Sequence, residues 1–352
     1  MLKSVIAFFI VLLFSSCEPV KNYSGHQKDS TINNEDYSSK INGLSFVSPP
    51  KQLKEDSYTL PKTIVAADWL CFMPFGFIES NSNKVQYNTD WQWWGEKRSG
   101  IIEMLVLAKK LGYKSMLKPQ LWRDHSSYTG HHQYNTENDW ESFEFSYRKF
   151  ILEFAILADS LEVEIFCIGT ELEKFVINRP EYWKSLIADV RDEYRGKITY
   201  AANWDEFKRT PFWKELDFIG IDAYFPLSDA QSPSVDELKA AWMPHQNLLK
   251  FYSDSIKKPI LFTEYGYRSR DFATKSPWEH DRGGIVNLQI QVNAYEALFQ
   301  EFWDRPYFAG GFLWKWFPDY SNSGGIENSG FTPQRKPVEQ TIAKYYGLNS
   351  SD

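Results

Sequence analysis

The chain has 352 residues, and 46 Asp and Glu side chains against 39 Lys and Arg give it a net charge of −7. This length suits one large domain, and the acidic balance argues against a nucleic-acid partner, because phosphate-binding surfaces are usually basic. Aromatic residues make up 17% of the chain. They indicate either a large aromatic core or a surface of rings that stack on sugars.

The first residues predict an export signal. One Lys precedes an apolar run from Val5 to Phe14, and small residues then lead to Cys17. This run is too short to span a bilayer as a mature helix. The small residues directly before Cys17 resemble the lipobox of bacterial lipoproteins, although Phe14 stands where Leu is usual. We therefore expect residues 1–16 to be a lipoprotein signal peptide and Cys17 to be acylated; a cleaved signal with an incidental Cys is the alternative.

A polar segment follows and predicts a flexible tether. Residues 17–40 are polar, with Ser, Asn, Asp and Lys, and contain too few aliphatic side chains to fold. With the acylated Cys17, the tether indicates a lipid-anchored outer-membrane lipoprotein of the cell envelope, on either the periplasmic or the surface side. The membrane is then a partner only through the lipid. Cys71 and Cys167 lie in apolar runs and are expected to be buried free thiols.

Strand-like and helix-like stretches alternate through the rest of the chain, as βα units do. The predicted strands are Leu44–Ser48, Ile64–Pro74, Ser115–Trp122, Glu164–Gly169, Ile198–Trp204, Phe218–Phe225, Pro259–Tyr265 and Gly311–Phe317. The predicted helices are Ile101–Leu111, Trp140–Leu161, Tyr182–Tyr194, Val235–Ile256, Val286–Trp303 and Glu339–Tyr346. Eight such strands predict an α/β fold, a (β/α)8 TIM barrel, as a single catalytic domain over residues 41–348. An open doubly wound sheet is the competitor, but no Gly-rich phosphate loop follows an early strand.

Two glutamates close short apolar runs, at the ends of the fourth and seventh predicted strands. Glu171 ends EIFCIGTE and Glu264 ends PILFTE. Strict alternation would place Glu171 on the same side of its strand as Cys167 and Gly169. A carboxylate there gains nothing for the core, and the C-terminal ends of barrel strands carry the chemistry. The competitor Glu173 is expected in the following turn.

The two carboxyl groups suit the cleavage of a glycosidic bond. One of them, uncharged, would give a proton to the departing oxygen, and the other, ionised, would attack the anomeric carbon. The structural alternative is that each glutamate pairs with an arginine such as Arg123 or Arg268. No serine elbow and no set of histidines at ligand spacing favours another chemistry, so we expect no metal and no cofactor.

Five segments together resemble glycoside hydrolase family 113, whose known members are endo-acting β-1,4-mannanases: ADWLCFMPFGF, KSMLKPQLW, FCIGTELEKF, FIGIDAYFPL and ILFTEYGYRS. The resemblance covers about residues 42–347 and implies the clan of retaining (β/α)8 glycosidases. It implies that Glu171 is the acid/base, that Glu264 is the nucleophile, and that the substrate is a β-mannan or a related oligosaccharide. Thr170 departs from the wider clan, in which Asn commonly stands before the acid/base and binds the sugar 2-hydroxyl.

Further residues at predicted strand ends are candidates for the site. Tyr224 is expected to orient Glu264 through its hydroxyl group. The expected substrate-binding residues are Lys118, Trp122, Thr170, Asn203, Trp204, Trp314 and Trp316. The sequence leaves open a β-mannosidase or β-glucanase on the same scaffold, and a non-catalytic glycan-binding lipoprotein. We expect a monomer.

Overall fold

The computed structural model describes residues 39–80, 82–123, 128–279 and 284–347. The predicted signal peptide, Cys17 and all of the predicted tether except residues 39 and 40 lie outside these ranges.

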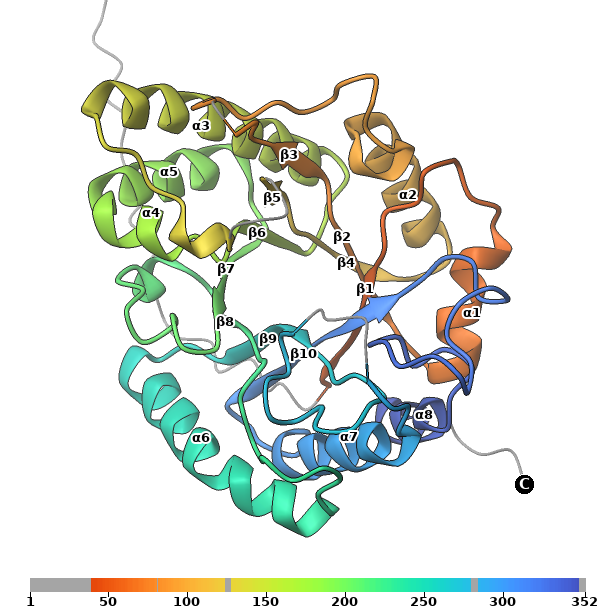
Figure 1. The fold of residues 1–352 in the computed structure, drawn as a ribbon. Coiled ribbons are helices and arrows are strands. Elements are labelled where there is room, and N and C mark those ends of the chain that lie inside the picture. Colours follow the sequence, from red (N-terminus) through yellow and green to blue (C-terminus); the bar gives the residue numbers. More distant parts are fainter. Residues whose placement is uncertain (1–38, 81, 124–127, 280–283, 348–352) are drawn as a thin grey trace, which may run out of the picture. The chain divides into compact units, whose positions relative to one another are not determined.

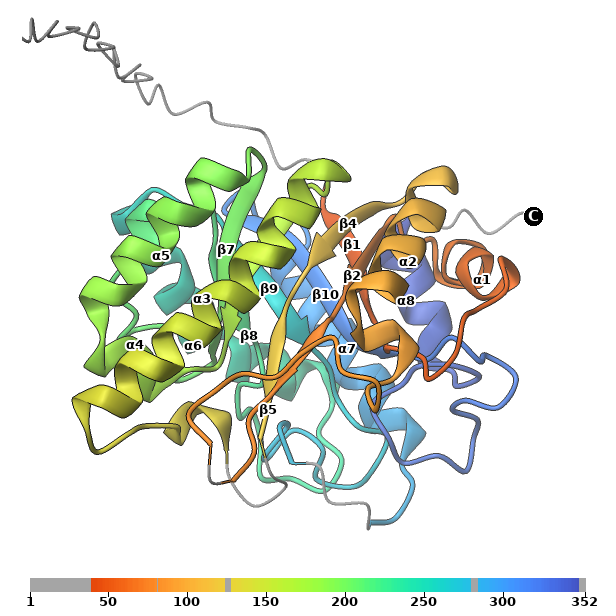
Figure 2. The ribbon, with the colours of Figure 1, turned by 90° about the horizontal axis from the view of Figure 1, so that it is seen from above.

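Eight parallel strands form a closed barrel, in the order β1-β10-β9-β8-β7-β6-β4-β2, with β2 pairing back to β1. Helices surround the strands (Figure 1). The strands point toward one end, where β5 lies (Figure 2). The predicted TIM barrel, a single domain, is confirmed. The barrel strands are β1 (Ile41–Phe46), β2 (Trp69–Phe72), β4 (Lys114–Leu117), β6 (Ile165–Thr170), β7 (Lys197–Asn203), β8 (Ile219–Asp222), β9 (Ile260–Tyr265) and β10 (Phe308–Trp316).

A second, two-stranded parallel sheet pairs β3 (Phe75–Phe77) with β5 (Gln120–Trp122). The helices are α1 (Asp56–Val65), α2 (Arg98–Lys110), α3 (Glu137–Ser160), α4 (Glu173–Asn178), α5 (Pro180–Glu193), α6 (Val235–Ile256), α7 (Leu288–Phe302) and α8 (Val338–Tyr346). Between β7 and β8 the described chain forms only a short 3₁₀ turn, Trp213–Glu215. Local capping starts the longest helices. Thr136 accepts a hydrogen bond from the Asp139 backbone N–H at the start of α3, and Ser234 forms a capping box with Glu237 at the start of α6.

Two predicted strands each joined parts of separate elements. The segment Ile64–Pro74 begins with the last turn of α1, a helix that the sequence did not predict, and only its centre is β2. Pro61 inside α1 obscured the helix, because proline is a poor residue for a helix interior. The segment Ser115–Trp122 is divided into β4 and β5. Pro119 lies between them and has no N–H for a ladder hydrogen bond.

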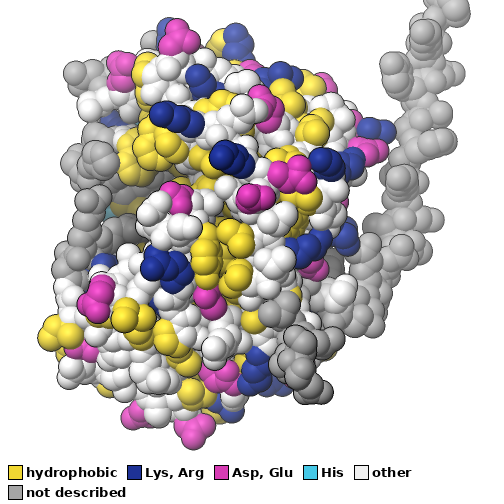
Figure 3. Space-filling model, turned by 90° about the vertical axis from the view of Figure 1, so that its right-hand side faces the viewer, with side chains coloured by type: hydrophobic (Ala, Val, Ile, Leu, Met, Phe, Trp, Pro, Cys, Tyr) yellow, Lys and Arg dark blue, Asp and Glu magenta, His cyan; other side chains and the backbone are white. Residues whose placement is uncertain are grey.

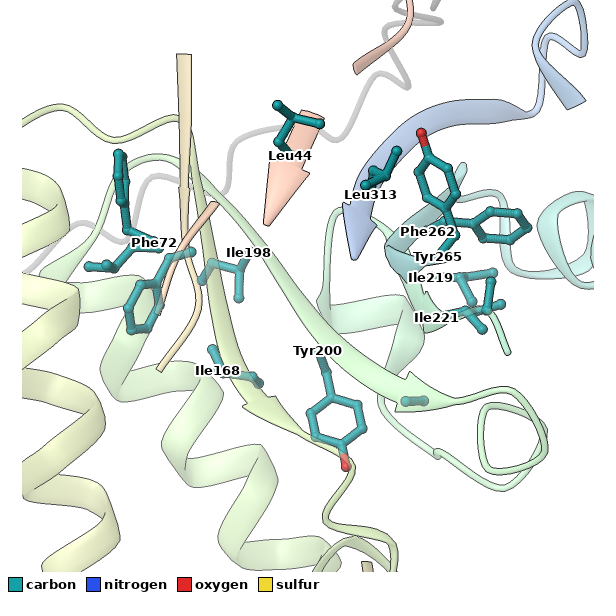
Figure 4. Packing of buried hydrophobic residues seen from close by; sticks show 14 of the residues in the cluster. Leu44, Phe72, Ile168, Ile198, Tyr200, Ile219, Ile221, Phe262, Tyr265 and Leu313 are labelled. Atoms are coloured by element: carbon teal, nitrogen blue, oxygen red, sulfur yellow. The ribbon is translucent and has the colours of Figure 1, made fainter. Parts of the chain in front are cut away.

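The core has two layers, one on each face of the barrel wall. Side chains such as Leu44, Phe72, Ile219 and Phe262 belong to the layer between strands and helices (Figure 4). The second layer fills the barrel: Ile41, Trp69, Cys71, Met73, Met116, Ile165, Cys167, Ala201, Phe218, Leu261, Ala309 and Phe312. Cys71 and Cys167 are buried free thiols, as predicted. The filled interior leaves the chemistry to the strand ends.

On the face shown in Figure 3, Lys and Arg side chains are interspersed with Asp and Glu. No helix within the described residues is both long and apolar enough to cross a membrane.

Candidate active site

Three carboxylates lie at the C-terminal ends of barrel strands. Glu171 directly follows β6, Asp222 is the last residue of β8, and Glu264 lies one residue before the end of β9. Asp222 and Glu264 are register partners on neighbouring strands. The sequence predicted the positions of Glu171 and Glu264 at strand ends, and the structure places both there.

Glu264 is held by side chains on both of its oxygens. Oε1 accepts hydrogen bonds from the Lys118 ammonium group and, at 3.3 Å, from Gln120 Nε2. Oε2 accepts a hydrogen bond from the Tyr224 hydroxyl group at 2.7 Å. Glu264 and Tyr224 are buried. Hydrogen bonds to both oxygens, one of them from a charged donor, fix the carboxylate in place.

Lys118 is completely buried and lies between two carboxylates. Besides its bond to Glu264, its Nζ is 3.9 Å from Asp222 Oδ1. Burial lowers the pKa of Lys118, but the charges of Asp222 and Glu264 outweigh it and raise this pKa above the ordinary value. The structure shows the buried ammonium group engaged by the protein's own carboxylates, and the expected binding of sugar hydroxyls by Lys118 stays a prediction.

Asp222 was not among the predicted site residues. Its Oδ1 accepts a hydrogen bond from Thr263 Oγ1 at 2.7 Å, whereas its buried Oδ2 has no hydrogen-bond partner among the described residues. Burial raises the pKa of Asp222 to about 7, and the charge of Glu264 adds to this effect, while Lys118 and Thr263 lower it. Asp222 therefore titrates near neutral pH, unlike an ordinary aspartate.

The backbone at Glu171 is unusual. Its φ of 51° lies in the left-handed region, which non-glycine residues rarely adopt. Cys167 pairs with Thr199 and Thr170 pairs with Ala201, so three steps along β6 match two along β7. This extra residue is a bulge, and such irregularities concentrate at barrel rims and active sites.

The bulge corrects the argument from alternation. A Cβ on Gly169 would lie 2.8 Å from the Tyr147 hydroxyl and 2.9 Å from Trp183, which both belong to the outer core layer. Gly169 therefore faces outward, whereas Cys167 faces the barrel interior. Glu171 reaches the strand end through the bulge and its left-handed backbone, not through strict alternation.

The electrostatic surroundings of Glu171 favour its neutral form. Although part of the residue is exposed, burial is the largest cause that raises the pKa of Glu171 well above its usual value. The negative charges of Asp222 and Glu264 raise this pKa further, and Glu206 adds to them. No described residue donates a hydrogen bond to the Glu171 carboxyl group. Raised pKa values of this origin are typical of general acids.

A buried chain of hydrogen bonds supports the Glu171 backbone. The Glu171 N–H donates to Ala201 O at 2.8 Å, and the next N–H, of Leu172, donates to the Tyr200 hydroxyl at 2.6 Å. That hydroxyl in turn donates to Glu206 Oε1 at 2.7 Å. Burial raises the pKa of Glu206 to about 8, against lowering by its hydrogen bonds from Tyr200 and the Asn203 backbone.

The aromatic residues of β10 lie on different sides of the strand. Trp314 is partly exposed, packs against the barrel-filling core, and has the Lys315 ammonium group 5.1 Å from its ring centre. Burial lowers the pKa of Lys315, while Glu264 raises it, so this unpredicted cation also lies near the site. Trp316 is completely buried in the outer core, and its expected role in sugar binding is wrong.

The other predicted binding residues are distributed around the strand ends. Asn203 donates to the Tyr128 hydroxyl at 3.0 Å, and Trp204 stacks on Trp278 with ring centres 5.6 Å apart. Thr170 Oγ1 is buried and has no hydrogen-bond partner among the described residues. Trp122 is exposed on β5. Their roles in substrate binding stay predictions.

Glu173, the predicted competitor of Glu171, and Arg123, a predicted ion-pair partner of the glutamates, have other contacts. Glu173 pairs with Arg209, whose Nε donates to it at 2.6 Å. Arg123 contacts His132, with 2.6 Å between Nη1 and Nδ1. Glu264 thus has a lysine as its cation instead of an arginine. Within the described ranges, no group of three or more His, Cys, Asp or Glu side chains is arranged to hold a metal ion.

The arrangement brings together a carboxyl group whose neutral form is favoured and a carboxylate fixed by a buried cation.

Sequence analysis missed four residues of the site: Asp222, Gln120, Glu206 and Lys315. Asp222 carries the signal that revealed the two glutamates, since it closes the apolar run FIGID. Gln120 is polar within a short strand after Pro119, and Glu206 lies in a loop, so neither had such a signal.

Comparisons with known proteins agree with this geometry. The model of Glycoside Hydrolase Family 113 matches residues 52–336. A solved GH113 β-1,4-mannanase is 24% identical, with a TM-score of 0.76, over 87% of this chain and 98% of the other. A GH113 β-mannanase from Alicyclobacillus acidocaldarius in complex with ManMIm is 25% identical, with a TM-score of 0.74, over 87% and 97%. A Faecalibacterium prausnitzii β-glucuronidase shares the fold at 14% identity and a TM-score of 0.58, over 87% and 48%. No curated protein matches the sequence.

Proposed function

The chain belongs to glycoside hydrolase family 113, and from this membership we propose that it is a retaining glycosidase that cleaves β-linked hexose polysaccharide, with β-1,4-mannan as its main substrate. The observation that carries the proposal is the contrast between the two glutamates. Glu264 has both oxygens held by donors, one of them the buried Lys118 cation. Glu171 has its pKa raised well above the usual value, first by burial.

The proposed reaction is a double displacement. Glu171 protonates the departing glycosidic oxygen while a Glu264 oxygen forms a bond to the anomeric carbon. Glu171, now ionised, then removes a proton from water, which attacks the same carbon and releases Glu264. The anomeric configuration is inverted twice and is therefore retained. Tyr224, Gln120 and Lys118 keep the attacking carboxylate in place before the sugar arrives.

The choice of mannan is supported by the two GH113 mannanases that align over 87% of the chain. Partly exposed Trp314, which packs against the barrel-filling core, offers a ring for the sugar that is cleaved.

The test is a panel of mannan, glucomannan, β-glucan and short oligosaccharides, with new reducing ends and product sizes measured over time and the first product's anomeric form read by NMR. We expect mannan to be cleaved to oligosaccharides with retained configuration, and Glu264→Ala to abolish the cleavage. Unaltered cleavage by Glu264→Ala would reject the proposal. Release of single mannose units would favour a β-mannosidase. Preferential cleavage of β-glucan would favour a β-glucanase, and binding without new reducing ends would favour a glycan-binding lipoprotein.

We also propose that Cys17 anchors the protein by a lipid to the outer membrane of the cell envelope, and that the catalytic domain acts as a monomer. The lipobox-like sequence supports the anchor. Metabolic labelling with a fatty acid should mark the wild type and not Cys17→Ser, and the variant should leave the membrane fraction. Labelling of both proteins would contradict the proposed site. Light scattering of the Cys17→Ser protein tests the monomer.

A further inference from the structure

The small sheet of β3 and β5 has one face in the core and one face outside it. A Cβ on Gly76 would lie 2.5 Å from Val85 and 3.2 Å from Phe150 of α3, so this position faces the core. Leu121, its register partner on β5, is buried. Because side chains alternate along a strand, the flanking residues of both strands project from the opposite face.

This outer face adjoins the candidate active site. It presents Phe75 and Phe77 from β3, and Gln120 and Trp122 from β5. Gln120 donates to Glu264 Oε1 at 3.3 Å, and Phe75 packs against the core that fills the barrel. Phe77 and Trp122 lie two residues farther along their strands than Phe75 and Gln120. At the rise per residue of a β-strand, this step is about 7 Å. The face therefore leads away from the proposed nucleophile.

Exposed aromatic rings gather at the far end of this face. Trp91 is 59% exposed and Trp122 is 43% exposed. The Trp91 ring lies against Phe77, with ring centres 4.6 Å apart, and Phe77 pairs in register with Trp122. Single exposed apolar residues are common on proteins, but a group of them marks a binding surface.

Buried polar contacts fix the loop that carries Trp91. The adjacent residue Gln92 is buried, donates to Phe75 O at 2.9 Å, and accepts from the Thr89 N–H at 2.9 Å. The Gln86 backbone exchanges two hydrogen bonds with Phe77, at 2.7 and 2.8 Å. The rings are therefore placed before a ligand arrives, which lowers the entropy lost on binding.

We propose that Phe77, Trp91 and Trp122 form a binding surface for sugar rings of the same polysaccharide chain, beyond the residues that flank the cleaved bond. The inference rests on the proposed function. A continuous β-linked chain is the occupant that the geometry favours, because Gln120 connects this surface to Glu264 along one sheet face. Flat pyranose faces cover exposed indole rings as aromatic side chains do. The enzyme then favours long chains over short ones.

The test compares a long polysaccharide with the shortest oligosaccharide that the wild type cleaves. Trp91→Ala and Trp122→Ala should each lower kcat/KM on the polymer by about tenfold, the equivalent of ~1.4 kcal/mol of lost contact. On the short substrate the decrease should be much smaller. The matched control is Phe251→Ala, which removes another exposed ring, on α6, and should alter neither rate. An unchanged ratio of polymer to oligosaccharide rates in both Trp variants would overturn the inference.

A binding measurement separates this inference from the proposed function. The Glu264→Gln protein should migrate more slowly in gels that contain polysaccharide. Adding both Trp91→Ala and Trp122→Ala to this protein should abolish the retardation. If the wild type produces no reducing ends, the proposed function fails, while the gels still test the surface. If the double variant instead changes a self-association seen by light scattering, a second copy covers the rings and the inference is wrong.

Discussion

Lys118, at the end of β4, donates a hydrogen bond to Glu264 near the end of β9, and both side chains are buried. β4 and β9 are not neighbours in the barrel, so the lysine reaches across its interior. The same ammonium group lies 3.9 Å from Asp222. One buried cation thus balances two carboxylates, and the position of Glu264 depends on a residue that is completely buried.

Replacement of this cation should impair both catalysis and folding. Lys118→Met leaves the Glu264 carboxylate without its charged donor, so we expect kcat to fall by about 10²-fold or more. Breaking a buried ion pair also costs about 3–5 kcal/mol of stability. The measurements are steady-state kinetics on the best substrate and thermal unfolding. Lys250→Met, which removes an exposed ion pair on α6, should change neither. A less stable variant with unaltered kcat would contradict the role given to Lys118.

Glu171 should behave as the proton donor. Glu171→Gln keeps the shape of the side chain but cannot transfer a proton, so kcat/KM on polysaccharide should fall by about 10²–10⁴-fold. Burial raises the pKa of Glu171, so the wild type should stay active until this group loses its proton, and rates should then fall as the pH rises. The variant should lack this basic limb. On aryl glycosides with acidic leaving groups, which need little help from a proton donor, the Glu171→Gln variant should lose much less activity.

The matched control for Glu171 is the glutamate two residues later. Glu173→Gln breaks the ion pair with Arg209 outside the site and should keep the basic limb of the wild type. If Glu173→Gln loses the limb and Glu171→Gln keeps it, the two roles are exchanged.

The order of the barrel strands could be predicted from the sequence because each buried strand is a short apolar run bounded by polar residues. The orientation of side chains near the strand ends could not. Trp314 and Trp316 are two residues apart, so alternation would place both on one face. However, β1 pairs Leu44 with Leu313 but Phe46 with Trp316, which gives β10 one extra residue. Such an extra residue changes the face without any marker in the composition.

The same limit applies to the site. Bulges precede Glu171 on β6 and Glu264 on β9, where Ile221 pairs with Phe262 but Asp222 pairs with Glu264. Carboxylates that end apolar runs could be recognised, because burying an unpaired charge in a core is unfavourable. The contacts of Lys118 depend on how far its side chain extends across the barrel interior, and local sequence pattern does not encode this distance.

Asp222 should tune the proton donor by charge. Its negative charge raises the pKa of Glu171, second only to burial. Asp222→Asn removes this charge and keeps an oxygen for the Thr263 hydroxyl, so the pKa of Glu171 should decrease. The basic limb of the pH profile for kcat/KM should then move to lower pH. Asp254→Asn, on the exposed side of α6, is the control. A purely structural role for Asp222 would lower rates at every pH and leave the limb in place.

Glu206 should make the protein less stable as the pH rises. Burial raises its pKa from 4.5 in the unfolded chain to about 8 in the folded protein. The folded state therefore holds the proton more tightly, and the stabilisation this gives is complete below pH 4.5. It is lost between about pH 4.5 and 8, by at most about 1.4 kcal/mol per pH unit. Denaturant unfolding at several pH values should show this decline.

The neutral variant Glu206→Gln isolates the effect of this proton. Its free energy of unfolding should decline less steeply over the same range than that of the wild type. Its stability at low pH should be lower, because the Tyr200 hydroxyl and the Asn203 N–H each donate to a different oxygen of Glu206, and the amide nitrogen that replaces one of these oxygens cannot accept. Glu193→Gln, at an exposed position at the end of α5, should retain the wild-type slope. If the free energy of unfolding declines with pH equally steeply in Glu206→Gln and the wild type, Glu206 is already ionised in the folded protein at low pH. Glu206 would then support the Glu171 backbone, through Tyr200, as a charged group.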